Sequence, residues 1–186
     1  MADFWLNHQG TVSLFTERVI LRKFSISDAS DMYNNWASDK DVAKYTLWNV
    51  NESINETKSF LEDWQLRYES KQYYHWAIVL KENMQVIGSI SISGLNNYLK
   101  CCNIGYTLSK KYWNMGITTE ATKCVMDFMV NNVGIQKIYA YHDVENYASG
   151  RVLQKCGMKY VKRKKKIFLS MSKPLIDCDY YCFSVK

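Results

Sequence analysis

The stretch Ile104-Gly-Tyr-Thr-Leu-Ser-Lys-Lys-Tyr-Trp-Asn-Met-Gly-Ile-Thr-Thr-Glu-Ala121 decides how this chain is interpreted. It predicts a strand that passes through a glycine-bearing loop, Trp113–Thr119, into the first turn of a helix. Such a junction leaves several backbone N–H groups without intrahelical acceptors, at the positive end of the helix dipole. Gly116 permits close approach, and Thr118 and Thr119 add hydroxyl donors. The junction is a candidate cradle for an anion such as a pyrophosphate. It matches neither the Walker A loop nor G-x-G-x-x-G, which disfavours ATP and NAD.

Apolar periodicity predicts the elements that precede this junction. The run Arg18–Phe24 alternates as a half-buried strand does, and Ser25–Asp28 has the capping-box pattern that opens a helix. A second helix is signalled at Asn51–Glu52. Three β-rich runs follow, at Tyr74–Leu80, Gln85–Ser93 and Asn103–Leu108. The short polar turn between the first two of these runs predicts a hairpin.

After the junction the sequence predicts a helix, a strand, another helix and two further strands. The first helix ends at Gly134, and the strand spans Lys137–His142. Asn146 caps the next helix, which ends at Gly157. The last two strands are expected at Lys159–Leu169 and Tyr180–Val185. A crossover helix inside an otherwise antiparallel sheet is typical of a mixed α+β domain. Because no stretch has the composition of a linker, we expect one domain over residues 1–186, with an N-terminal extension at residues 1–15.

Composition narrows the class of protein further. The chain has 186 residues, 47% of them hydrophobic and 15% aromatic, which is enough for a core without disulfides. Its first residues lack the pattern of a secretory signal, and no apolar run is long enough to cross a membrane, so we expect a cytoplasmic protein. The six cysteines are predicted to be reduced and mostly buried or half-buried. Neither they nor the three scattered histidines have the spacing of zinc ligands, so no metal is expected.

The net charge of +6 comes from one local patch. Seven of the 24 cationic residues fall in a short stretch without acids, and the remainder of the chain has 17 cations against 18 carboxylates. These seven residues are Lys155, Lys159, Lys162, Arg163, Lys164, Lys165 and Lys166. The simpler interpretation is a solvated strand or loop rim. The alternative is attraction of an anion, whether a phosphate-bearing cofactor, an acidic substrate or RNA.

The sequence resembles the GNAT superfamily of acyl-CoA-dependent N-acetyltransferases, and within it the branch that acetylates the N-termini (alanine or serine) of ribosomal proteins. Three landmarks match in order over residues 16–186. The first is Thr16–Arg22 ahead of a helix that contains Asp28 and Ala29. The second is Ile104-Gly-Tyr followed by Tyr112–Ala121, and the third is Asn146-x-x-Ser149 followed by Leu153–Met158. Each landmark alone is weak, whereas the ordered set is specific.

The resemblance implies an α+β fold in three layers: a mixed, mostly antiparallel, splayed sheet of about seven strands with helices on both faces. It implies acetyl-CoA as the cofactor. A strand splayed by a bulge would pair with the pantetheine arm as with an added strand, through the backbone of Tyr106, Thr107 and Leu108. The pyrophosphate would be held by the N–H groups of Met115, Gly116, Ile117, Thr118 and Thr119.

Two further residues gain roles from the resemblance. Asn146 would hydrogen-bond the cofactor's amide arm. Ser149 would lie near the sulfur, and it is the candidate catalytic proton donor to the departing thiolate. A backbone N–H near Thr107 or Leu108 could stabilise charge on the thioester oxygen. In the simpler interpretation, Ser149 satisfies first-turn amides beside the Asn146 cap.

The chain departs from the family pattern where acid and base residues are common. A carboxylate often found just before Ile-Gly-Tyr is Asn103, a tyrosine of the last helix is Leu153, and a following glutamate is Val161. In the pyrophosphate loop, Thr118 stands where glycine or alanine is usual. The general base is therefore unassigned. An α-amino group titrates near 8 and lysine near 10.4, which favours an N-terminal amine as the acceptor.

We therefore expect an acetyl-CoA-dependent N-acetyltransferase in which a primary amine, most readily a protein or peptide N-terminal α-amine, attacks the thioester directly. The alternatives are a small-molecule enzyme for a polyamine or an amine antibiotic, and a non-catalytic acyl-CoA- or RNA-binding module. Neither a membrane nor nucleic acid is an expected partner, and the chain would be a monomer or homodimer. Trp48 is a candidate acceptor contact. His142 could relay a proton, although a structural role is favoured.

Overall fold

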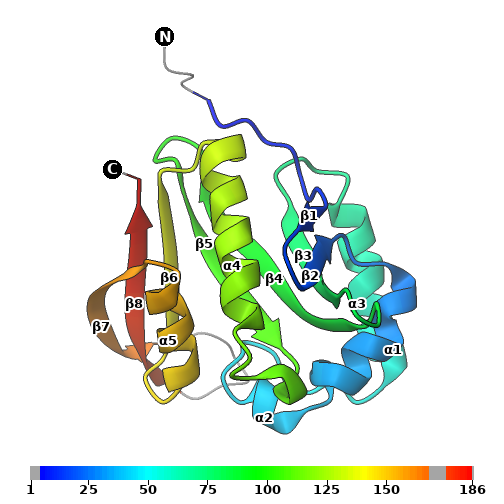
Figure 1. The fold of residues 1–186 in the computed structure, drawn as a ribbon. Coiled ribbons are helices and arrows are strands. Elements are labelled where there is room, and N and C mark those ends of the chain that lie inside the picture. The colour runs from blue at the N-terminus through cyan, green and yellow to red at the C-terminus, as the bar shows by residue number, and fades with distance from the viewer. Residues whose placement is uncertain (1–4, 168–174, 186) are drawn as a thin grey trace.

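A single mixed sheet organises the chain, whose computed structural model describes residues 5–167 and 175–185 (Figure 1). The strand order is β1-β2-β3-β4-β5-β6-β8-β7, and every neighbouring pair is antiparallel except β5 with β6. The strands are β1 (Leu14–Phe15), β2 (Val19–Arg22), β3 (Tyr74–Leu80), β4 (Val86–Asn96), β5 (Cys101–Leu108), β6 (Lys137–Asp143), β7 (Lys159–Ile167) and β8 (Ile176–Ser184).

The predicted mixed, mostly antiparallel α+β architecture is confirmed, with eight strands in the described residues rather than about seven. The additional strand is β1, which lies inside the expected N-terminal extension and pairs with β2. It has only two residues, too few to show an alternation in the sequence. The predicted strand Lys159–Leu169 is confirmed through Ile167, and its last two residues lie outside the described part.

Side-chain caps mark where three of the α-helices in the described residues begin. The α-helices are α1 (Ala29–Met32), α2 (Lys40–Ala43), α3 (Ile54–Arg67), α4 (Ile117–Phe128) and α5 (Tyr147–Lys155). The predicted capping box is present: the Ser25 hydroxyl accepts a backbone N–H, and the Asp28 carboxylate accepts the Ser25 N–H at 2.8 Å. Helix α3 is capped by Ser53, one residue after the predicted start, because Asn51 is buried and donates to Thr57 Oγ1 at 2.7 Å.

Helices cover both faces of the sheet, which gives the three layers (Figure 1). Helices α1 and α3 pack on one face of β2–β4 around Phe24, Trp36 and Leu61. Helix α4 packs on the opposite face, where Trp76 and Val125 belong to the larger core. The alternation along β3 sends its side chains to these two cores in turn.

The sheet opens between β5 and β6, as the resemblance implies. These strands pair only from Cys101 to Asn103, after which β5 stays with β4 and β6 stays with β8. The resemblance implies a bulge on the strand that carries Tyr106–Leu108, but the register of β5 with β4 is unbroken from Asn103 to Leu108 and shifts only between Ser93 and Asn96, on β4. The opening therefore arises from divergence of the parallel strands.

Two further sequence expectations concern the cysteines and the membrane. All six cysteines lie in the described part as free thiols, three of them buried and three half-buried, as predicted. Over residues 5–167 and 175–185, no helix has the length and apolar character needed to cross a membrane.

Candidate active site

The free edge of β5 is the first component of the site. Ser109 N–H donates to Ile87 O on the β4 side, whereas Gln136 N–H donates to Lys100 O on the β6 side. Because backbone groups of successive strand residues point to opposite edges, even-numbered residues of β5 face β6. Beyond Asn103 that side of β5 has no strand paired with it in the described residues. An extended ligand can pair there.

The backbone groups of the three residues predicted to hold the pantetheine arm do not all point to the same edge of β5. The backbone groups of Tyr106 and Leu108 face the opening, although Trp113 Nε1 donates to Leu108 O at 2.8 Å and occupies that carbonyl. The prediction is wrong for Thr107, because its carbonyl points toward β4. The carbonyl oxygen lies so close to Gly88 of β4 that a Cβ on Gly88 would have no room. The backbone of Thr107 is committed to the sheet, so Tyr106 and the Leu108 N–H remain as the groups offered to a ligand.

The first turn of α4 is the second component. Gly116 is the N-cap residue in the left-handed conformation, with φ +77°, and no side chain caps this helix. The Glu120 N–H is the first that bonds back into the helix, to Gly116 O at 3.0 Å. The amides of Ile117, Thr118 and Thr119 therefore have no acceptor within the helix. Met115 and Gly116 are exposed, which leaves the turn accessible to an anion.

Arg18 holds this turn from the N-terminal side of β2. Its Nη1 donates to Met115 O at 2.7 Å, and its Nε donates to Glu120 Oε2 at 2.7 Å. Burial alone would raise the pKa of Glu120, but hydrogen bonds from Thr16 and Arg18 outweigh it and lower the pKa. The sequence prediction missed this contact, because Glu120 in a first helical turn is explained by the dipole alone.

The start of α5 is the third component and contains both predicted polar residues. Asn146 Oδ1 accepts the Ser149 N–H at 3.1 Å, so Asn146 caps the helix and keeps its amide N–H groups for other acceptors. The Tyr106 hydroxyl donates to Ser149 O at 3.1 Å. Burial raises the pKa of Tyr106, so this phenol stays protonated. The hydrogen bond joins β5 to α5 across the opening, a role the sequence did not indicate for the side chain of Tyr106.

The positions that depart from the family pattern do not supply an acid or base here. Leu153 is buried in the larger core, and the Asn103 side chain lies against Gly94. Val161 is exposed on β7. Ser149 is half-buried, and its hydroxyl has no hydrogen bond to a described residue, which leaves it free for a ligand.

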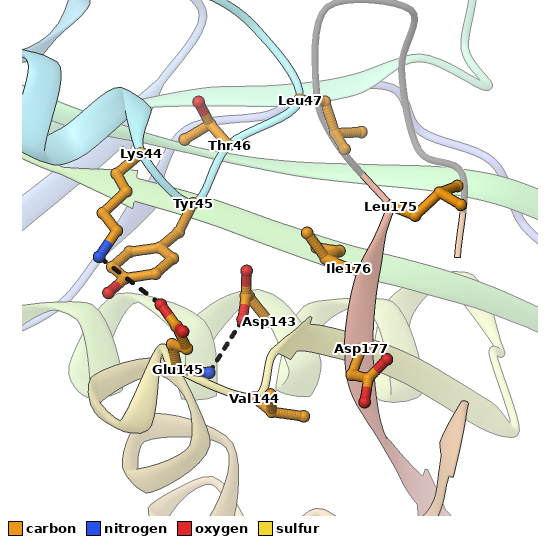
Figure 2. Close-up of a pocket in the computed structure, with 10 residues that line it drawn as sticks. All are labelled: Lys44, Tyr45, Thr46, Leu47, Asp143, Val144, Glu145, Leu175, Ile176 and Asp177. Atoms are coloured by element: carbon orange, nitrogen blue, oxygen red, sulfur yellow. Dashed lines mark hydrogen bonds and ion pairs between the residues drawn. The ribbon is translucent and has the colours of Figure 1, made fainter. Parts of the chain in front are cut away.

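A cavity of about 530 Å³ lies at the far end of the opening (Figure 2). It is formed by the segment after α2, the turn between β6 and α5, and the start of β8. Its lining residues are Lys44, Tyr45, Thr46, Leu47, Asp143, Val144, Glu145, Leu175, Ile176 and Asp177. Asp143 ends β6, four residues beyond the last pairing of β6 with β5, so the cavity lies where these strands have diverged.

The cavity is lined by both carboxylates and apolar side chains. Among the lining residues that the structure describes, Asp143, Glu145 and Asp177 contribute three carboxylates against the one cation Lys44, a formal balance of −2. Lys44 Nζ lies 3.7 Å from Glu145 Oε2 and 4.8 Å from the centre of the Tyr45 ring. One oxygen of Asp143 accepts the Glu145 N–H at 2.9 Å. Figure 2 shows the apolar residues Leu47, Leu175 and Ile176 grouped away from Lys44 and Glu145. An ammonium group beside an apolar chain suits such a cavity.

Two secondary hypotheses change with the structure. Trp48 packs against the core around Trp36, whereas its neighbour Leu47 lines the cavity. His142 is buried on the α5 side of β6, and its Nδ1 lies 2.7 Å from Asp143 O. Its Nε2 is buried without a hydrogen-bond partner in the described residues and sits under Gly150, too close to admit a Cβ there. A packing role for His142 therefore accounts for its position.

Comparison with known proteins agrees with this geometry. The sequence model of the acetyltransferase (GNAT) domain matches residues 18–159. The uncharacterized N-acetyltransferase YoaA of Bacillus subtilis is 28% identical over 144 residues, covering 77% of this chain and 81% of that protein. The chain spans most of the length of this relative.

Solved structures show the same fold. A ribosomal-protein-S5-alanine acetyltransferase from Vibrio fischeri is 20% identical with a TM-score of 0.81, covering 93% of this chain and 96% of that one. The microcin C7 self-immunity acetyltransferase MccE, solved with acetyl-CoA and AMP, is 20% identical with a TM-score of 0.80, covering 91% and 94%. The first of these is consistent with the predicted branch. The match to the family model and the curated relative named an N-acetyltransferase favour an enzyme over the alternative of a non-catalytic binding module.

Uncapped amides at the start of α4 suit a diphosphate, and the free edge of β5 suits an extended arm with amide groups, so the residues present fit acetyl-CoA. The cavity lies beside the end of β6, where β5 and β6 have diverged. The chain belongs to the GNAT family of acetyl-CoA-dependent N-acetyltransferases.

Proposed function

We propose that this enzyme acetylates the α-amino group at the N-terminus of a protein or peptide. The observation that carries the proposal is the cavity at the divergence of β5 and β6, which is lined by both carboxylates and apolar side chains. An N-terminal residue presents that combination, since its ammonium group adjoins a side chain. Among proteins of the same fold, one is named a ribosomal-protein-S5-alanine acetyltransferase, which supports a protein acceptor.

The acid–base character of the site supports an α-amine over a lysine side chain. Acetyl transfer needs a neutral amine, and an α-amino group titrates near 8 whereas lysine titrates near 10.4. At pH 7.5 roughly a quarter of an α-amine is neutral, against about one lysine in a thousand. Because Asn103 replaces the carboxylate common at that position, the proton of the amine passes to water in this proposal.

The residues of the chain divide the work of binding and proton transfer. The amides of Met115–Thr119 bind the diphosphate, and Tyr106 and Leu108 present backbone groups to the extended arm, where the Asn146 amide donates a further hydrogen bond. The Leu108 N–H faces the opening, where it can donate to a carbonyl oxygen. Ser149 donates a proton to the departing sulfur and regains one from water, which has taken up the proton released by the amine. When bound, acetyl-CoA supplies the acetyl group as a thioester.

A polyamine or amine antibiotic is the second candidate acceptor, and the formal charge of −2 around the cavity favours it specifically. A panel of N-terminal peptides, polyamines and aminoglycosides, assayed by release of free CoA thiol, separates the two. The proposal predicts turnover with the peptides and no turnover with peptides whose N-terminus is blocked and whose only amine is a lysine. Turnover of polyamines or aminoglycosides with inert peptides would contradict it.

A further inference from the structure

One face of the outer strands carries aromatic and cationic side chains. Antiparallel partners project from the same face of a sheet, and the register places Tyr141 opposite Tyr180 and Tyr180 opposite Lys162. One row along, Asp143 lies opposite Cys178, which lies opposite Lys164. We name the surface formed by Tyr141, Tyr180, Lys162 and Lys164 the tyrosine–lysine face.

Helix α5 packs on the opposite side of these strands. His142 and Tyr181 project toward that side, where their rings lie 5.5 Å apart and Gly150 of α5 contacts both. On the tyrosine–lysine face, the Tyr141 and Tyr180 rings stack at 5.3 Å, and Tyr141 remains 36% exposed. Tyr141, Lys162 and Lys164 are therefore accessible to a partner, whereas Cys178, between Asp143 and Lys164, is buried.

The lysines on this face are available for a partner. Arg163 projects to the other side and is bound by Asp179 through two hydrogen bonds of 2.8 and 2.9 Å. Lys164 Nζ lies 4.6 Å from the centre of the Tyr180 ring. Neither Lys162 nor Lys164 has an ion pair with any residue that the structure describes, and both are exposed.

The tyrosine–lysine face is continuous with the acceptor cavity. Asp143 lines the cavity and ends the strand that carries Tyr141. Lys164 lies in the same row as Asp143, two strands away, or about 10 Å. The surface is thus anionic at the cavity and cationic along β7, so a ligand that covers both must have a positive end followed by negative charge.

We propose that the tyrosine–lysine face binds an acidic segment that directly follows the N-terminal amine of a polypeptide acceptor. The inference rests on the proposed function and names the class of acceptor. An extended peptide advances about 3.3 Å per residue, so a span of about 10 Å from the cavity reaches the third or fourth residue. Carboxylates from the third residue onward would meet Lys164 and Lys162, while the ammonium group enters the anionic cavity.

Charge complementarity favours a polypeptide over RNA. Stacked tyrosines beside lysines would suit single-stranded RNA as well. The row that holds Lys164 ends at Asp143, however, and the carboxylates of Glu145 and Asp177 lie nearby in the cavity. These carboxylates repel phosphates at the same place where they attract an ammonium group.

The test compares two peptides of equal length with the same first two residues, one with Glu and the other with Gln at the third to sixth positions. Thiol release gives kcat/KM, and fluorescence anisotropy of peptides labelled at the C-terminus gives binding without turnover. We expect kcat/KM to be about tenfold higher for the Glu peptide at low salt and the difference to shrink as salt rises.

Charge reversal assigns the preference to this face. The double variant Lys162→Glu with Lys164→Glu should lose the tenfold preference in both assays. The matched control is Lys58→Glu with Lys71→Glu, which makes the same change of charge at exposed lysines on α3 and the turn after it. The control should keep the preference. If it loses the preference as fully as the first variant, net charge and not the face is responsible, and the inference is wrong.

The remaining outcomes separate this inference from the proposed function. Equal turnover of the two peptides by the unaltered enzyme would overturn the acidic docking and leave N-terminal acetylation standing. Binding of the Glu peptide without turnover, lost in the Lys162 and Lys164 variant, would support the docking while the proposed function fails. Displacement of the Glu peptide by a tighter-binding single-stranded RNA would assign the face to nucleic acid and overturn the inference.

Discussion

Arg18 and Glu120, 102 residues apart in sequence, form an ion pair in which Arg18 Nε donates to Glu120 Oε2 at 2.7 Å. The other carboxylate oxygen accepts the Arg18 N–H at 2.8 Å, and the guanidinium also reaches Met115 O. The contact joins the first landmark of the family resemblance, Thr16–Arg22, to the turn at the start of α4, which the resemblance assigns to the pyrophosphate. Part of the conformation of that turn therefore depends on a residue outside it.

Removing the Arg18 side chain should weaken the turn without unfolding the enzyme. The variant Arg18→Ala frees Met115 O and leaves Glu120 with fewer donors, so we expect the dissociation constant for CoA, measured by calorimetry, to rise about tenfold. The matched control is Arg67→Ala, which removes an exposed arginine paired with Asp63 on α3. An equal dissociation constant in the two variants would show that Arg18 does not support the turn.

Replacing Gly116 tests whether the turn itself binds the cofactor. Gly116 and Gly157 both have left-handed backbones, with φ +77° and +81°, so a leucine at either position incurs a similar backbone cost of about 1–2 kcal/mol. Only Gly116 adjoins the uncapped amides. We expect Gly116→Leu to weaken CoA binding at least about tenfold and Gly157→Leu to change it less than about twofold. Similar losses in both variants would contradict the assignment.

Ser149 is expected to act in chemistry rather than in binding. The variant Ser149→Ala keeps the backbone groups that bond to Asn146 and Tyr106, so the start of α5 should be preserved. We expect kcat to fall about a hundredfold with an unchanged dissociation constant for CoA, and Ser149→Thr to restore most of the activity. Steady-state thiol release and calorimetry together check this. A kcat within twofold of the unaltered enzyme would remove Ser149 as the proton donor.

A buried histidine away from the site should dominate stability in mild acid. His75 is enclosed by Trp64 and Tyr73, and burial, with a smaller contribution from the charge of Arg67, lowers the pKa of His75 from 6.5 to about 3. Below pH 6.5 the unfolded chain binds a proton that the folded protein excludes. The free energy of unfolding should therefore decrease as the pH is lowered, by up to about 1.4 kcal/mol per pH unit between pH 6 and pH 4.

Urea unfolding at several pH values checks this expectation. His75→Gln has no titratable ring, so its stability should decline less steeply than that of the unaltered protein over the same range. If the stabilities of both proteins decline equally with decreasing pH, groups other than His75 determine the loss of stability in acid. The comparison of slopes matters because His75→Gln also changes the packing against Trp64 and lowers stability at every pH.

Features that depend on neighbours in sequence could be predicted. The capping box of Ser25 and Asp28, the left-handed residues Gly134 and Gly157, and the cap at Asn146 all follow from local chemistry, and the structure has each of them. The opening of the sheet came from the family resemblance, since no periodicity indicates where two strands diverge.

Features that depend on distant residues could not be predicted. The Tyr106–Ser149 hydrogen bond and the anionic cavity join segments that are separated in sequence by tens of residues or more. The prediction for Thr107 is wrong for another reason. The resemblance implies that the backbone groups of three consecutive residues pair with the pantetheine arm, whereas the backbone groups of alternate residues in a strand point to opposite edges. Register, which decides that alternation, is set by pairing with β4.

Calorimetric titration of the unaltered enzyme with CoA tests the proposed cofactor site most directly. Because the amides beside Gly116 are expected to bind the diphosphate, we expect saturable binding of one CoA per chain, and release of free thiol from acetyl-CoA once an N-terminal peptide is added. Absence of binding at millimolar CoA would contradict it.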